Sequence, residues 1–117
     1  MSARLASKLA STSSFKYRLG AVIVKNGRVL STGVNELRYT SAHIPKKHIT
    51  SLHAEQAAIV RLLRHLDKLA GATLYVSRVD REGRSRMARP CKMCQDLITA
   101  VGIKKVFFTT ENGVEQL

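Results

Sequence analysis

Two short motifs in the chain hold residues that can bind a metal ion. His53 and Glu55 stand two residues apart in a His-Ala-Glu run, and Cys91 and Cys94 stand three apart in a Pro-Cys-Lys-Met-Cys run. Three protein ligands of the Cys₂His type leave the fourth tetrahedral position of a zinc ion open, as in catalytic sites. Such an ion lowers the pKa of its bound water to about 7. We therefore predict His53, Cys91 and Cys94 as zinc ligands and Glu55 as the catalytic residue that moves protons.

Each of these residues also has an ordinary structural interpretation when it is taken alone. His53 could be a histidine at the start of a helix, and Glu55 a first-turn acid that interacts with the helix dipole. The two cysteines are the only ones in the chain and could form a thiol–disulfide motif, but they are too few for a disulfide framework. A zinc ion with a purely structural role, as in a nucleic-acid-binding module, would need no acid beside it. The combination of all four residues favours a catalytic zinc site.

We expect both motifs to open helices. One helix is predicted from about Leu52 to Ala70, with Gly71 as its stop, and Pro90 fits the first position of another helix that ends at Gly102. Thiols three residues apart in a first helical turn project to the same side. If the two helices pack side by side on a sheet, their N-termini meet, and the positive ends of both dipoles favour thiolates there.

The remaining segments predict the elements that position these helices. An Asn-Gly turn at 26–27 between two β-rich runs is the strongest hairpin signal in the chain. We predict irregular loops over 36–50 and 80–89, a helix over 2–11, strands over 21–24, 28–32, 73–77 and 103–110, and a short antiparallel strand over 114–117. The helical crossover between the third and fourth strands implies that these two are parallel. The 117 residues are therefore expected to form a single three-layer α/β domain.

Composition limits the partners of this domain. Twenty Lys and Arg residues against eight Asp and Glu give a formal net charge of +12, which attracts phosphates on a nucleotide or a polymer, although it could also serve solubility alone. The scarcity of aromatic residues argues for a free nucleotide or nucleoside rather than an extended strand. No apolar run approaches the roughly 20 residues of a membrane span, and no signal peptide is recognisable. We expect a cytoplasmic protein without a membrane partner.

The two motifs, in this order and each at a helix start, resemble those of the cytidine-deaminase-like superfamily of zinc-dependent deaminases. The resemblance extends over nearly the whole chain: Gly20–Val24, Gly33–Asn35 and Gly71–Val76 are similar to the first three strands of that family. It implies an α/β/α domain with a central mixed sheet of four to five strands and Zn²⁺ as cofactor. The implied reaction is hydrolytic deamination of a cytosine nucleoside or nucleotide, such as deoxycytidylate. The alternative is a deaminase that acts on cytosine or adenine in single-stranded DNA or RNA.

The same resemblance implies further roles. Asn35 matches an asparagine that contacts the sugar or base in several branches of the family, and backbone N–H groups near Ala54 and Cys91 would orient the base. Independently of the resemblance, the charge of Arg84 and Arg86, in the basic loop that leads into Cys91, could hold a 5′-phosphate or follow a nucleic-acid backbone, or the loop could be merely solvated. This loop is longer than in typical tRNA adenosine deaminases and looks more like that of virus- and phage-type members. The family also leads us to expect a homo-oligomer.

Overall fold

The computed structural model describes residues 2–11, 18–39 and 49–117, and of residues 36–39 and 49–52 only the backbone. Its elements follow one another along the chain as α1 (Ser2–Ala10), β1 (Arg18–Lys25), β2 (Arg28–Val34), β3 (Glu36–Tyr39), β4 (Ile49–Leu52), α2 (Ala54–Val60), the 3₁₀ turn η2 (Leu63–His65), α3 (Leu66–Leu69), β5 (Thr73–Val79), β6 (Ser85–Arg86), α4 (Lys92–Ala100), β7 (Lys105–Thr110) and β8 (Gly113–Gln116). None of the described helices is long and apolar enough to cross a membrane.

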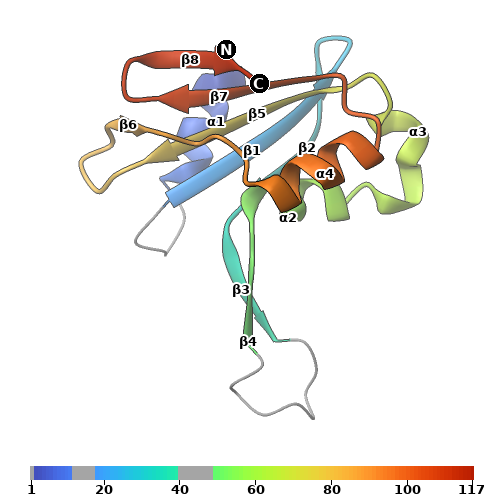
Figure 1. The fold of residues 1–117 in the computed structure, drawn as a ribbon, viewed down its shortest axis with the longest axis horizontal. Coiled ribbons are helices and arrows are strands. Elements are labelled where there is room, and N and C mark those ends of the chain that lie inside the picture. Colours follow the sequence, from blue (N-terminus) through green and yellow to red (C-terminus); the bar gives the residue numbers. More distant parts are fainter. Residues whose placement is uncertain (1, 12–17, 40–48) are drawn as a thin grey trace.

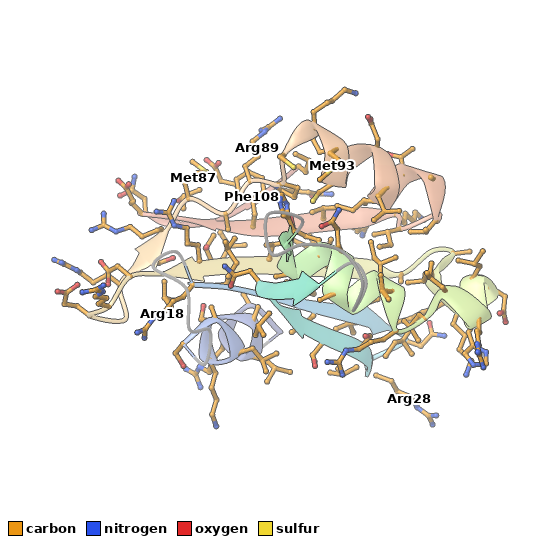
Figure 2. All side chains as sticks on the ribbon, turned by 90° about the horizontal axis from the view of Figure 1, so that it is seen from below. Arg18, Arg28, Met87, Arg89, Met93 and Phe108 are labelled. Carbon is orange, nitrogen blue, oxygen red and sulfur yellow. The ribbon has the colours of Figure 1, made fainter. Side chains whose placement is uncertain are left out.

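A mixed sheet forms the middle layer. Its strands lie in the order β2-β1-β5-β7-β8, and the short β6 pairs with β5. Strands β5 and β7 are parallel, as the helical crossover through α4 predicts, and the other pairs are antiparallel. Helix α1 covers one face of the sheet and α2 and α4 cover the other (Figures 1 and 2). The prediction of a three-layer α/β fold with a central mixed sheet is confirmed, with β6 as an added short strand.

Two glycines allow the helices to approach the sheet closely. A Cβ atom on Gly33 of β2 would lie 2.5 Å from the Ala54 carbonyl oxygen of α2. A Cβ atom on Gly20 of β1 would instead meet the Ala6 carbonyl oxygen of α1 on the opposite face. Between the sheet and α2 and α4 lies the main core, which includes Ile23, Ile59, Leu74, Ile98 and Phe108. The N-terminal turn of α2 therefore rests directly on the β2 backbone.

Two turns form as their sequences predict. Asn26 and Gly27 both have positive φ angles, 53° and 76°, and connect β1 to β2 in a two-residue hairpin. Gly102, with φ 85°, ends α4: its N–H bonds to the Thr99 carbonyl, and the Ile103 N–H bonds to the Ile98 carbonyl. This pair of hydrogen bonds is a Schellman cap, which needs a residue in the left-handed region.

The prediction of an irregular loop over 36–50 is wrong at both of its ends. Strands β3 and β4 pair with each other in antiparallel register, from Glu36 opposite Leu52 to Tyr39 opposite Ile49, and form an arm that extends away from the sheet (Figure 1). Each strand has only four residues, and its hydrogen-bond partner lies more than nine residues away along the chain. Local sequence patterns carry no signal for such a pairing. Residues 40–48, also part of the predicted loop, lie outside the described residues.

The single helix predicted from Leu52 to Ala70 is also wrong. Leu52 belongs to β4, α2 ends at Val60, and a 3₁₀ turn separates it from α3. At the break, the Leu62 N–H bonds to the Ile59 carbonyl and the His65 N–H to the Leu62 carbonyl, three residues back rather than four. No glycine or proline marks this position, so tertiary packing overrides the helix propensity of the segment. The predicted stop at Gly71 is confirmed, because Gly71 has φ 79°.

Gly33→Ala is expected to destabilise the fold by about 1–3 kcal/mol, because the added methyl group forces α2 away from β2. It should also lower zinc content, since His53 directly precedes the displaced turn. Gly20→Ala is the matched control: it overpacks the α1 face and should lower the melting temperature while zinc content stays unchanged. Thermal unfolding and metal analysis of both variants test this expectation, and an equal loss of zinc in both would contradict it.

Candidate metal centre

The predicted zinc ligands occupy equivalent places at the starts of two helices. His53 is the N-cap of α2 and Cys91 is the N-cap of α4, both with extended backbone, and Cys94 is the third residue of α4. Pro90 therefore precedes the cap and is not the first helical residue, which is Lys92, two positions later. The backbone at each N-terminus is fixed by a glutamine. Gln56 accepts a hydrogen bond from the His53 N–H at 2.9 Å, and Gln95 donates one to the Pro90 carbonyl at 2.8 Å.

The three donor atoms lie at distances that suit one tetrahedral ion. The His53 Nδ1 atom is 3.2 Å from the Cys94 Sγ atom and 3.8 Å from the Cys91 Sγ atom, and all three atoms lie within 4.8 Å of one another. Zinc bond lengths of 2.0–2.1 Å to nitrogen and 2.3 Å to sulfur place such ligands about 3.6 Å apart. Cys94 is buried, His53 is half-buried and Cys91 is exposed. The cluster is therefore closed toward the core and accessible from outside.

Glu55 lies in the first turn of α2 and is 4% exposed. Burial raises the pKa of its carboxyl group above the ordinary value, although a backbone hydrogen bond and nearby His53 and Cys94 act in the opposite direction. Burial also raises the pKa of the Cys94 thiol, and the Glu55 carboxylate adds to that effect. Two acidic groups that both resist ionisation call for a nearby cation, which a divalent metal ion supplies.

Two residues predicted to bind substrate, Ala54 and Asn35, are buried. Ala54 lies next to the metal cluster in α2, and Asn35 lies near the start of β1. Ala54 is fully buried and is the first residue of α2, where backbone N–H groups lack partners within the helix. Asn35 is 9% exposed and follows β2. Its Oδ1 atom accepts a hydrogen bond from the Leu19 N–H at 3.1 Å, and its own N–H donates to the Leu19 carbonyl. Asn35 thus fixes the connection between β1 and the arm, and a contact of Asn35 with substrate stays a prediction.

Arg84 and Arg86 both form ion pairs with Asp80, a pairing that the sequence did not predict. They lie on the β5–β6 hairpin, where Asp80 accepts bonds from the Nε atoms of both arginines at 3.1 and 3.2 Å. Arg84 also pairs with Glu82, and Arg86 with Glu111. A small hollow of about 250 Å³ at this hairpin is lined by both arginines and both hairpin acids. Their positive charge is therefore partly neutralised within the loop, and their contact with a phosphate stays a prediction.

Asp80→Asn is expected to destabilise the protein in a pH-dependent way. The pKa of Asp80 is lowered, first because the Arg84 backbone N–H donates to its carboxylate. A lowered pKa means that the stabilising contribution is present above the ordinary Asp pKa of about 3.9 and is lost as the pH falls through the folded-state value. Urea unfolding across this pH range should show a difference between wild type and variant that is constant near neutrality and shrinks in acid. A difference that persists unchanged in acid would refute this explanation.

Arg89, two residues before Cys91, belongs to the same basic loop as Arg84 and Arg86. Its guanidinium lies over the Phe108 ring, 5.8 Å from the ring centroid, on the side of the sheet that α4 covers (Figure 2). Phe108 is 2% exposed, whereas Arg89 is exposed. In the described part of the chain, Arg84, Arg86 and Lys92 pair with carboxylates and Arg89 does not. Lys46 and Lys47, in the segment predicted as a loop over 36–50, lie outside the described residues.

The chain is similar to known deaminases in sequence and in fold. The family model described as "Cytidine and deoxycytidylate deaminase zinc-binding region" matches residues 1–110. A deoxycytidylate deaminase of Mycobacterium phage D29 is 32% identical over 114 residues, which cover 81% of this chain and 80% of that protein. The dCMP deaminase of cyanophage S-TIM5 in its apo form superposes with a TM-score of 0.66 at 25% identity, covering 92% of this chain and 78% of that one. Cytidine deaminase from Mycobacterium leprae gives a TM-score of 0.57 at 26% identity, covering 97% and 88%.

Proposed function

Since the chain belongs to the cytidine and deoxycytidylate deaminase family and is a zinc-dependent hydrolase, we propose that it converts deoxycytidylate and water to deoxyuridylate and ammonia. The observation that carries this proposal is the cluster of His53, Cys91 and Cys94 around an accessible position, with the buried Glu55 beside it. A similar cyanophage enzyme, 27% identical with a TM-score of 0.60 and coverage of 91% of this chain and 74% of that one, was solved in complex with dCMP and dUMP. That relative supports a nucleotide substrate here.

The donor set fits zinc rather than a harder cation. Two thiols and an imidazole are the ligands that zinc takes in proteins, whereas calcium and magnesium prefer oxygen ligands. When bound by these three side chains, zinc would lower the pKa of a water molecule at the open fourth position to about 7. We assign the three positions to His53 Nδ1, Cys91 Sγ and Cys94 Sγ.

Glu55 is assigned the proton transfers of the reaction. Its carboxylate would accept a proton from the attacking water, pass a proton to the ring nitrogen of cytosine, and assist the departure of the amino group as ammonia. Its burial supports this role, because a carboxyl group with a raised pKa holds and releases a proton closer to neutral pH. The backbone N–H groups at Ala54 and Cys91, at the two helix N-termini, are assigned to orient the base. Asn35 is assigned to the sugar or the base.

The 5′-phosphate is assigned to the basic loop that leads into Cys91. Arg84 and Arg86 are the candidates from sequence. Arg89 is the additional candidate from the structure, because it is near the metal cluster in sequence and stays exposed without a carboxylate partner among the described residues. Its stacking on Phe108 orders the guanidinium before any ligand arrives, which reduces the entropy lost on binding.

Arg89→Gln should raise KM for deoxycytidylate by about 10- to 100-fold, because a hydrogen bond to a charged group contributes about 1.5–3 kcal/mol. It should leave KM for deoxycytidine unchanged. The double variant Arg84→Gln/Arg86→Gln should show the same preference with a smaller effect, because Asp80 already neutralises part of their charge. Arg61→Gln, an exposed arginine that follows α2, serves as control. Steady-state kinetics with both substrates give the result. If nucleotide and nucleoside were affected equally, the loop would have no role in phosphate binding.

Ammonia release from a panel of substrates tests the proposed function itself. The panel comprises deoxycytidylate, cytidylate, deoxycytidine, deoxycytidine triphosphate, adenosine, single-stranded DNA and tRNA. We expect deoxycytidylate to give the highest kcat/KM. The net charge of +12 favours the alternative, a deaminase of single-stranded DNA or RNA, and turnover of the polymers above that of every free nucleotide would establish it instead. We also propose a homo-oligomer, which light scattering would reveal as a mass above 13.0 kDa.

A further inference from the structure

The β1–β2 turn, α3 and the start of β7 lie at the end of the sheet away from the β5–β6 turn (Figure 1). Together with the segment after α2, they carry seven basic residues. This cluster, which we call the basic end, is formed by residues of the β1–β2 turn, the segment after α2, α3 and the start of β7. Its members are Lys25, Arg28, Arg61, Arg64, Lys68, Lys104 and Lys105. Sheet register brings three of them to the same end of the strands: Lys25 is opposite Arg28, and Lys105 is opposite Thr73, whose partner on its other side is Val24. The Lys25 Nζ atom also reaches the backbone carbonyl of Asp67 in α3, at 3.5 Å.

The charge of the basic end is not neutralised locally. Asp67 is the one acidic residue in these segments, and Lys25 contacts its backbone rather than its carboxylate. The ion pairs between described residues lie elsewhere, on the β5–β6 hairpin and on α4. Seven like charges in one region repel one another and raise the free energy of the folded state. An anionic partner would remove that repulsion.

The surface of the basic end is hollowed. A depression of about 590 Å³ lies between the β1–β2 turn and α3, and its charged lining residues are Lys25, Arg28 and Lys68 together with the single acid Asp67. A second depression, of about 340 Å³, lies between β2 and the end of α2 and contains Arg61. Leu30 lines both, so the two depressions are neighbours. Figure 2 shows the Arg28 side chain projecting outward from the molecule.

We propose that the basic end binds the phosphate backbone of a nucleic-acid duplex, without regard to base sequence. The cations extend over more elements than the lining of a single depression, so one nucleotide would contact only a part of them, whereas a polymer could contact them together. A second copy of the chain is a poor partner, because it would bring a second set of unpaired cations to the same surface. The described aromatic side chains, Tyr75, Phe107 and Phe108, lie within β5 and β7, so the basic end offers no stacking platform for single-stranded bases.

This surface is separate from the metal centre, and the proposal does not depend on the substrate of the enzyme. Binding through phosphates alone releases counterions, so the affinity falls with salt at a slope of about 0.9 per phosphate contacted. The surface would tether the enzyme to nucleic acid while the metal centre stays free for its substrate. Its loss should therefore leave zinc content and turnover of small substrates unchanged, and it should not lower the melting temperature, because the variant carries fewer mutually repelling charges.

Fluorescence anisotropy with a labelled DNA duplex of about 20 base pairs, from about 50 to 200 mM salt, tests the proposal. The full-length wild type should bind, and Arg28→Gln/Lys68→Gln should bind at least tenfold more weakly at the lowest salt, with a slope smaller by about 2. The matched control is Arg4→Gln/Lys8→Gln on α1, which also removes one exposed arginine and one exposed lysine. Its affinity and slope should equal those of the wild type.

Four results would overturn the proposal. The first is that the wild type does not bind the duplex at the lowest salt. The second is that both double variants lose affinity equally, which would indicate a non-local effect of net charge. Tighter binding of a polyglutamate peptide or of phosphatidylserine vesicles than of the duplex would assign the surface to an acidic protein or a membrane. Displacement of the duplex by stoichiometric deoxynucleoside triphosphate would assign the depression to a single nucleotide.

Discussion

Glu55→Gln is expected to lower kcat for deoxycytidylate by about 10²–10⁴-fold while zinc stays bound, because this range is the usual contribution of a general acid–base residue. Glutamine has nearly the same shape as glutamate and fits the same buried place in the first turn of α2. Its amide can neither accept a proton from water nor deliver one to the cytosine ring. The cluster of His53, Cys91 and Cys94 contains no atom of Glu55, so metal content should be preserved.

The Glu55 variant has a second readout that does not depend on turnover. Burial raises the pKa of Glu55 in the folded, metal-free protein, so its carboxyl group contributes most to stability below its ordinary pKa and loses that contribution as the pH rises through the folded-state value. Metal-free Glu55→Gln should therefore gain stability relative to metal-free wild type as the pH is raised. Glu82→Gln, the same change at an exposed site, is the control. Near wild-type kcat in Glu55→Gln would exclude Glu55 as the proton carrier.

Cys94→Ala is expected to abolish zinc binding, and with it deamination. Cys94 is fully buried, and its Sγ atom is 3.2 Å from the His53 Nδ1 atom, so no water can replace it without a change in packing. Zinc content of the purified protein should fall from one ion per chain to nearly none. A ligand present at a thousand times its dissociation constant stabilises the folded state by about 4 kcal/mol, so the melting temperature should fall as well.

The matched control for Cys94→Ala is Met93→Ala, the neighbouring residue on α4, which is 55% exposed. It should keep full zinc content and activity. A chelator provides a further comparison: it should lower the melting temperature of the wild type to that of Cys94→Ala and leave the variant unaffected. Stoichiometric zinc in Cys94→Ala would show that the metal is held elsewhere in the protein.

The metal cluster could be predicted because each half of it is local. The His-Ala-Glu and Pro-Cys-Lys-Met-Cys runs each place their donors within one helical turn, and helix-start signals survive even where the length of the helix is wrong. This is the case for α2, which ends at Val60 although the apolar pattern continues to Leu69. Gln56 is also local to its partner: it stands three residues after His53, at the position of the glutamate or glutamine in a capping box.

The features that sequence did not predict depend on residues brought together by the fold. Strands β3 and β4 acquire their hydrogen bonds only from each other, and Arg86 finds one of its carboxylates on Glu111, twenty-five residues farther along the chain. Arg89 stacks on Phe108 because the segment before α4 runs beside β7, where the Ala88 N–H donates to the Thr109 carbonyl. Arg84 and Arg86 of the basic loop were expected to be available to a phosphate, whereas both take part in a network of ion pairs on the hairpin. The prediction that residues 1–117 form one domain remains untested.

X-ray absorption at the zinc edge of the purified protein tests the open Cys₂His site most directly. We predict one zinc ion per chain, with two sulfur ligands at about 2.3 Å and two nitrogen or oxygen ligands at about 2.0–2.1 Å, the last of them a water molecule that an inhibitor could replace. This result would place His53, Cys91 and Cys94 around an ion with a free position for chemistry. Four sulfur ligands shared between two chains, or a zinc-free protein with Cys91 and Cys94 in a disulfide, would contradict it.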